Sequence, residues 1–188
     1  MTMFTNELAY IQDDTLRTIV RRYMEEAVPE YFYHCGASSS GKFHPTFSQG
    51  EGGLVRHTKA VVMFLDELMR MSSYAYMKQD YKDYAYAAAI VHDTCKYGMG
   101  AEMDKSAYKE HDKNAATFFE AFALENGYRP SELMLGAIRA HMGQWANDPT
   151  DRPFTNIDRA VHMADYMASR SFIDIPELSE AKRIAEKG

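Results

Sequence analysis

The chain has 188 residues, of which 46% are hydrophobic and 26% charged, and its formal net charge at pH 7 is −6. This length suits a single domain, residues 1–188, with a substantial apolar core. No apolar run approaches the roughly 20 residues that a transmembrane helix needs. The acidic balance and the lack of a long basic run argue against an extended nucleic-acid-binding surface. They still allow a small anionic substrate to bind at a local cluster of positive charge.

The cysteine content and the amino-terminal sequence both favour a cytoplasmic protein. The two cysteines, Cys35 and Cys95, do not provide a disulfide framework. Residues 1–7 lack the basic segment followed by an apolar segment that is typical of a secretory signal. We therefore expect a reducing, cytoplasmic environment.

Apolar residues recur at helical spacing in most of the chain, whereas no segment shows the alternation of a strand pair. The sequence therefore predicts an all-α fold of about six or seven helices. A long loop, residues 31–53, carries His44, and a second loop covers residues 143–155. The expected helices span about residues 6–27, 53–71, 80–96, 108–125, 130–141 and 156–170, with a short peripheral helix within 176–188.

The most distinctive segment ends the third of these helices. Residues 87–96 read Ala-Ala-Ala-Ile-Val-His-Asp-Thr-Cys-Lys, so an apolar run leads directly to His92, Asp93 and Lys96. Burying ionisable side chains is costly unless they are paired or bind a metal ion. We therefore interpret His92 and Asp93 as metal ligands on which other histidines converge.

Four histidines and two aspartates lie near the ends or on the apolar sides of separate predicted helices. Imidazole and carboxylate ligands without thiolates suit Fe, Mn, Zn, Ni or Co and argue against a structural cysteine-zinc site. Six ligands exceed what one catalytic ion needs with an open position, but they suit two ions, which favour displacement at phosphorus. The candidate ligands are His57, His92, Asp93, His111, His141 and Asp165.

This ordered set resembles the HD superfamily, which is named for its His-Asp pair. Residues 52–58, Gly-Gly-Leu-Val-Arg-His-Thr, resemble the Gly-Gly-Leu-x-x-His-Thr signature of a subgroup that includes a bacterial 3′-to-5′ exoribonuclease. Residues 92–96 resemble the superfamily's His-Asp-x-x-Lys motif, and residues 162–170 resemble its last metal-binding helix. His111 and His141 resemble the six-ligand, two-metal branch, which also includes symmetric diadenosine tetraphosphate hydrolases.

The resemblance covers about residues 44–170 and implies an HD-type helical bundle that hydrolyses a phosphoester or phosphoanhydride of a nucleotide or short oligonucleotide. It implies two divalent ions, Fe or Mn first, with Zn, Ni, Co or Mg as alternatives. One ion would be held by His57, His92, Asp93 and Asp165, and Asp93 would bridge to a second ion held by His111 and His141. A water molecule on these ions would lose its proton and attack phosphorus, because metal binding lowers the pKa of water from about 15.7 towards 7.

Several other residues are candidates for binding the substrate. Lys96, one turn beyond His92, would contact a phosphate oxygen and offset the developing negative charge. Trp145 is either a stacking surface for a base or a packing anchor, and His44 either approaches the site from its loop or is exposed. Further candidates for contacts with an anionic substrate are Arg56, Arg139 and Arg152.

Two other functions fit the same ligands. A few members of the superfamily with a six-ligand site are diiron oxygenases, and such a domain can also serve as a non-catalytic sensor of metal or nucleotide. Turnover without oxygen would exclude the oxygenase, and tight nucleotide binding without turnover would favour the sensor. The sequence does not predict the oligomeric state.

Overall fold

The computed structural model describes residues 3–38 and 44–187. Within these residues the chain forms ten α-helices and four 3₁₀ helices and contains no strand, which confirms the predicted all-α class. Seven of the α-helices have nine or more residues. The α-helices are α1 (Thr5–Leu8), α2 (Asp14–Glu26), α3 (Tyr31–His34), α4 (Gly53–Arg70), α5 (Ser72–Ala75), α6 (Gln79–Val91), α7 (His111–Glu125), α8 (Glu132–Ala140), α9 (Asn156–Ala168) and α10 (Pro176–Ala185). The 3₁₀ helices are η1 (Thr46–Ser48), η2 (Lys105–Glu110), η3 (Gly143–Trp145) and η4 (Pro149–Asp151).

Helix α6 is the centre of the bundle and packs against α4, α8 and α9. Its last two turns are almost purely apolar, and the side chains of residues 87–91 have no exposed surface. Small alanine side chains let the neighbouring helices approach α6 closely. Helix α9 packs along α4 and α8, so the four helices that carry most of the candidate ligands share one core.

The predicted helix over residues 6–27 is wrong in one respect, because the structure divides it into α1 and α2. Asp13 caps the start of α2 by accepting a hydrogen bond from the backbone N–H of Leu16 at 2.7 Å. The buried Asp83 carboxylate of α6 accepts hydrogen bonds from the backbone N–H groups of Gln12 and Asp13 at 3.1 and 2.8 Å. These side-chain acceptors stabilise a turn at a position where the periodicity of the sequence predicts one continuous helix.

The predicted helix over residues 80–96 also ends early, because α6 stops at Val91 and the chain continues in turns as far as residue 97. The Thr94 hydroxyl donates to the Val91 carbonyl oxygen at 2.8 Å, and the Tyr23 hydroxyl of α2 lies 2.9 Å from the same threonine oxygen. Tyr31 of α3 donates to Gly98 O and accepts from the Tyr97 N–H. Two buried tyrosines therefore fix the turn that carries the His-Asp pair.

The segment before α4 is tied tightly to the first turns of that helix. A Cβ atom at Gly53 would lie 2.3 Å from the Ser48 carbonyl oxygen, so only glycine fits there. Gly52 has a φ of +65°, in the left-handed region that favours glycine. The Gly-Gly pair of the predicted motif thus has a structural role. The predicted loop over residues 31–53 contains α3 and η1, and its residues 39–43 lie outside the described part.

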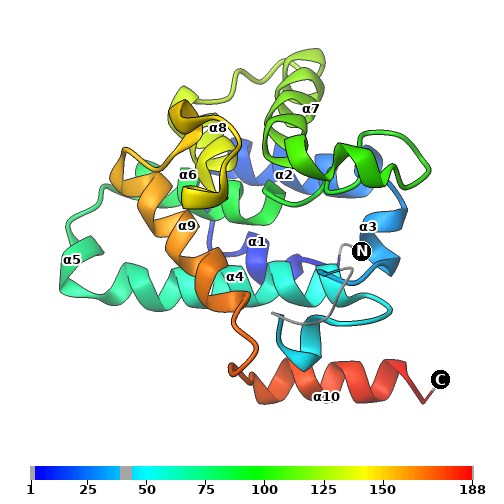
Figure 1. Ribbon diagram of the computed structural model, residues 1–188. Coiled ribbons are helices and arrows are strands. Elements are labelled where there is room, and N and C mark those ends of the chain that lie inside the picture. Colours follow the sequence, from blue (N-terminus) through cyan, green and yellow to red (C-terminus); the bar gives the residue numbers. More distant parts are fainter. Residues whose placement is uncertain (1–2, 39–43, 188) are drawn as a thin grey trace.

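The carboxyl-terminal helix α10 packs on η1 and α4, apart from the other long helices (Figure 1). Its position confirms the predicted peripheral helix. Among the described residues, no helix is both long and apolar enough to cross a membrane.

Candidate metal centre

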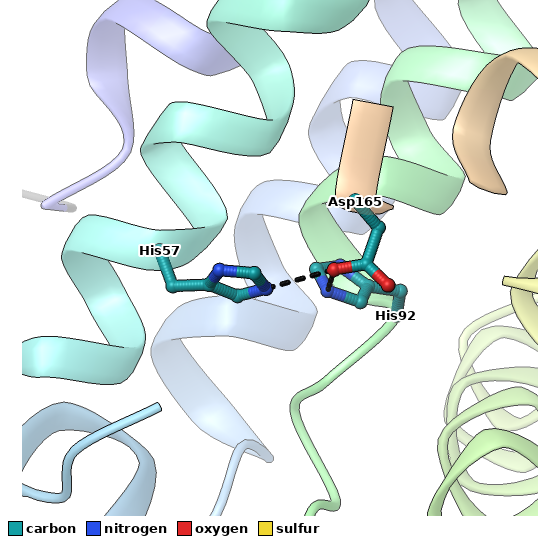
Figure 2. Close-up of side chains that lie close together, drawn as sticks. All are labelled: His57, His92 and Asp165. Carbon is teal, nitrogen blue, oxygen red and sulfur yellow. Dashed lines mark ion pairs between the residues drawn. The ribbon is translucent and has the colours of Figure 1, made fainter. Parts of the chain in front are cut away.

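The six predicted ligands come together as two groups of three. The first trio, His57, His92 and Asp165, comes from α4, the end of α6 and α9, and Figure 2 shows its side chains converging. The second trio is Asp93, His111 and His141. Within each trio the candidate ligand atoms lie within 4.8 Å of one another. The structure therefore brings together all six residues that the sequence pattern selects.

Asp93 lies between the two trios. Its Oδ2 atom is 3.8 Å from His57 Nε2 and 3.6 Å from His92 Nε2. Its Oδ1 atom is 3.2 Å from His111 Nε2 and 3.8 Å from His141 Nε2. One carboxylate therefore presents one oxygen atom to each group, which is the arrangement that a bridging ligand requires.

Three of the four histidines are oriented in the same way. The Nδ1 atoms of His92, His111 and His141 each donate to the backbone carbonyl three residues earlier, at 2.7, 2.6 and 2.7 Å. Since a carbonyl oxygen only accepts, the proton of each neutral ring is on Nδ1. The Nε2 lone pairs therefore face the site, and a backbone carbonyl behind the ring is the usual support of a metal-bound histidine.

The protonation state of the candidate ligand atoms and the distances between them both favour cation binding. Burial, with further contributions from His92 and His111, lowers the pKa of His141 to about 3, so this imidazole is neutral at pH 7. Its Nε2 atom lies 3.1 Å from Nε2 of His111, and two neutral rings with Nδ1 protons would present lone pairs to each other. Two atoms bound to one ion at about 2.1 Å would be about 3.0–3.4 Å apart, and His57 Nε2 lies 3.0 Å from Asp165 Oδ1.

Three buried atoms in these trios have no hydrogen-bond partner within residues 3–38 and 44–187, namely His57 Nδ1, His92 Nε2 and Asp93 Oδ1. Buried polar atoms are nearly always satisfied in folded proteins. His92 Nε2 and Asp93 Oδ1 lie among the candidate ligand atoms, where a cation would satisfy them. The residues present therefore fit metal ions.

Lys96 is buried and donates to Asp93 Oδ2 at 2.6 Å. Burial disfavours the charged form of Asp93, but the Lys96 ammonium favours it, and the pKa of this carboxyl lies well below its usual range. Asp93 is thus ionised, as a metal ligand must be. The ion pair also holds the lysine head group in the wall of the site.

A cavity of about 510 Å³ opens onto the trios. Its polar lining residues include His57, Asp93, Lys96 and His44, and its aromatic lining residues include Trp145 and Tyr166. The Trp145 ring stacks on Tyr166 with centroids 5.8 Å apart and planes at 9°, and the Arg170 guanidinium carbon lies 4.2 Å from the centre of the Tyr166 ring. The lining residues are His44, His57, Asp93, Lys96, Tyr108, His111, His141, Met142, Trp145, His162, Asp165, Tyr166, Ser169 and Arg170.

Three predicted substrate-binding arginines are not among the residues that line this cavity. Arg56 is buried and donates to the backbone carbonyls of the segment before α4. Arg139 pairs with Glu132 at 3.5 Å on the surface of α8, and Arg152 is exposed after η4. The spacing of residues in a sequence predicts which helix carries a side chain. It does not predict which partner that side chain binds.

The structure adds Tyr108, Tyr166 and Arg170 to the predicted cavity residues. The Tyr108 ring stacks on His111 with centroids 5.2 Å apart. Arg170 follows the end of α9 at Ala168, and its guanidinium folds back over the Tyr166 ring. The resemblance of residues 162–170 to a metal-binding helix was the available sequence signal for Arg170, whereas Tyr108 lies in a short 3₁₀ helix without a recognisable periodicity.

The family comparison agrees with this geometry. The sequence profile of the HD domain matches residues 54–170, more than half of the chain. The chain therefore belongs to the HD domain family, a superfamily of metal-dependent phosphohydrolases. No curated protein and no solved structure matched the chain.

Proposed function

We propose that this protein is a two-metal phosphohydrolase that cleaves a phosphoester or phosphoanhydride bond of a nucleotide or short oligonucleotide. The observation that carries the proposal is the position of Asp93 between two trios of ligands in the wall of one cavity. Six ligands suit two divalent ions, Fe or Mn first, with Zn, Ni, Co or Mg as alternatives. Membership of the HD family supports the reaction class.

Bound divalent ions would lower the pKa of a water molecule and polarise a phosphoryl oxygen. The charges of the cavity support an anionic substrate. Its two carboxylates, Asp93 and Asp165, are balanced by Lys96 and Arg170, so two divalent ions would make the site strongly positive. Lys96, held by Asp93, would present its positive charge to the phosphoryl group and stabilise negative charge in the transition state.

Arg170 is the cavity residue best placed to bind a second anionic group. Its Nε atom donates to Tyr166 O at 3.1 Å and its Nη2 atom donates to Ser169 Oγ at 2.7 Å. These bonds orient the guanidinium, and within the described residues Nη1 makes no hydrogen bond. We therefore assign to Arg170 the contact with substrate that the sequence pattern suggested for other arginines.

The aromatic part of the cavity supports a substrate with a base. The Trp145 side chain is 50% exposed although it stacks on Tyr166, so part of the indole surface is open to a ligand. Stacking of a base on an aromatic side chain contributes about 1–3 kcal/mol. A cavity of about 510 Å³ is within the usual range for small ligands, and it favours a nucleotide over an extended nucleic acid.

The test is hydrolysis by the full chain loaded with Mn²⁺ or Fe²⁺. Nucleoside monophosphates, dinucleoside polyphosphates and short oligonucleotides would be offered, and phosphate and nucleoside products measured. We expect turnover of at least one substrate, and a loss of at least about 100-fold in Asp93→Ala. Absence of turnover with every ion in protein that holds two ions per chain would contradict the proposal.

Three measurements on the same protein distinguish the alternative functions. Turnover that persists under anaerobic conditions excludes a diiron oxygenase. Oxygen consumption with an organic substrate would instead favour it. Tight nucleotide binding without turnover would favour a sensor.

A further inference from the structure

His44 is placed in the cavity by a segment that is fastened to α4. Arg56, next to the ligand His57, donates to the carbonyl oxygens of Phe47 at 2.5 Å, Gln49 at 3.1 Å and Glu51 at 2.7 Å. The absence of a side chain at Gly53 lets the same segment lie against the helix. These contacts fix residues 44–52 on the first turns of α4.

The His44 side chain meets the first trio. Its ring lies edge-on to His57, with centroids 5.5 Å apart and planes at 62°. The Gln49 side chain donates to the backbone carbonyl of His44 at 3.1 Å, which secures the main chain at this residue. His44 is a lining residue of the cavity together with His57, Asp165 and Lys96.

One nitrogen atom of the buried part of His44 has no hydrogen-bond partner among the described residues. This atom is Nδ1, and it is itself buried. A buried polar atom without a partner is unfavourable unless something else satisfies it. His44 belongs to neither ligand trio, so its ring lies beside the ions' ligands and not among them.

We propose that His44 is a catalytic residue that hydrogen-bonds the phosphoryl group of the substrate beside the His57 trio. The inference rests on the proposed function and adds a contact that the six ligands do not supply. A neutral imidazole can donate one hydrogen bond to a phosphoryl oxygen, and such a donor stabilises the charge that develops during displacement. The segment before α4 therefore contributes a side chain to the site beside His57.

The test compares His44→Ala and His44→Gln with wild type and with His34→Ala. His34 is a matched control because its ring is exposed, lies outside the cavity and pairs with Glu51 and Glu30. We expect His44→Ala to retain the metal content of wild type while kcat/KM falls about 10- to 100-fold, the effect of losing a hydrogen bond to a charged group. His44→Gln should recover part of the loss, and His34→Ala should match wild type.

A binding measurement makes the inference independent of turnover. Inorganic phosphate would be titrated into each metal-loaded protein by calorimetry, and we expect its affinity to fall by a similar factor only in the His44 variants. In Zn²⁺-loaded wild type, phosphate should also shift the ring nitrogen resonances of His44 and leave those of His34 unchanged. The wild-type experiment remains decisive if the variants do not fold.

The outcomes separate this inference from the proposed function. Loss of metal from His44→Ala would make His44 a ligand and overturn the inference. Unchanged phosphate affinity and unchanged kcat/KM in that variant would also overturn it, while active wild type would leave the proposed function standing. Wild type that binds phosphate through His44 but hydrolyses no ester would contradict only the proposed function.

Discussion

Replacing Asp93 with asparagine should affect metal binding by the second trio more than by the first. Asp93 is the only carboxylate of the second trio. The first trio keeps Asp165, which lies 3.0 Å from His57, whereas the second retains only two imidazoles. We expect Asp93→Asn to bind one ion per chain where wild type binds two. Asp165→Asn should lose the other ion, because Asp93 still serves the second trio.

The same substitution should also destabilise the metal-free protein. Lys96 is 5% exposed, and its ammonium lies 2.6 Å from Asp93 Oδ2, so the substitution leaves a buried positive charge without its partner. Breaking a buried ion pair in this way costs about 3–5 kcal/mol. This cost is on the order of one third of the free energy of unfolding of a typical domain, which is about 5–15 kcal/mol. Removing both partners in Asp93→Asn with Lys96→Met should recover most of the loss.

Two assays test these statements separately. Elemental analysis after loading with Mn²⁺ and desalting gives the number of ions per chain, and urea unfolding of the metal-free proteins gives the free energy of unfolding. Asp158→Asn is the control for metal content, because this aspartate lies on α9 with Asp165 but its carboxylate accepts from the backbone N–H of the N-cap residue Thr155 at 2.8 Å. Two ions bound to Asp93→Asn with wild-type affinity would refute the shared-carboxylate geometry, and unchanged metal-free stability would refute the ion-pair argument.

Three further predictions concern the stability of the helical fold and the ion pairs of one surface histidine. Asp83→Ala removes the acceptor of two backbone N–H groups between α1 and α2 and should lower the free energy of unfolding by about 2 kcal/mol in urea, with unchanged stability counting against it. Gly53→Ala should cost about 1–3 kcal/mol, because its Cβ would meet a carbonyl oxygen at 2.3 Å. Gly136→Ala, whose Cβ would make only an ordinary contact with Asp158 Oδ1 at 3.9 Å inside α8, should instead gain about 0.5–1 kcal/mol, and equal effects of the two glycine variants would contradict the packing argument. The two glutamate partners of His34 raise its pKa above 6.5, so their small stabilising effect is complete below that pH and is lost as pH rises through the raised value. Titration of the His34 ring by NMR should give a midpoint above 6.5, and a lower midpoint would show that these pairs do not form in solution.

The sequence was sufficient to select the residues of the two trios because their order and residue types carry chemical information. His57, the His-Asp pair, His111, His141 and Asp165 are spread over more than 100 positions, and the fold brings them within a few ångströms. The helical class also followed from periodicity. Neither inference required knowledge of the side-chain contacts, because the first depends on the order of residue types along the chain and the second on helical periodicity.

The arginine that lines the cavity could not be predicted in the same way. Arg56 precedes a ligand in a recognisable motif, yet its guanidinium is used by three backbone carbonyls of the preceding segment. Arg170 reaches the cavity because its own carbonyl and hydroxyl partners hold it there. The choice between these arginines depends on tertiary hydrogen bonds, which leave no periodic signal in the sequence.

The ends of the helices explain how the histidine rings of the candidate centre are oriented. They also explain why helical periodicity in the sequence does not predict this orientation. His92 and His141 are the residues at which α6 and α8 end, and His111 follows η2. The last carbonyls of a helix lack partners within it, and each of these rings satisfies one of them through Nδ1. The same hydrogen bond fixes the tautomer and turns Nε2 towards the other ligands. Three helices that end around one point therefore orient the site through the carbonyls of their own last turns. A helix prediction that extends a few residues too far, as over residues 92–96, misses this cause.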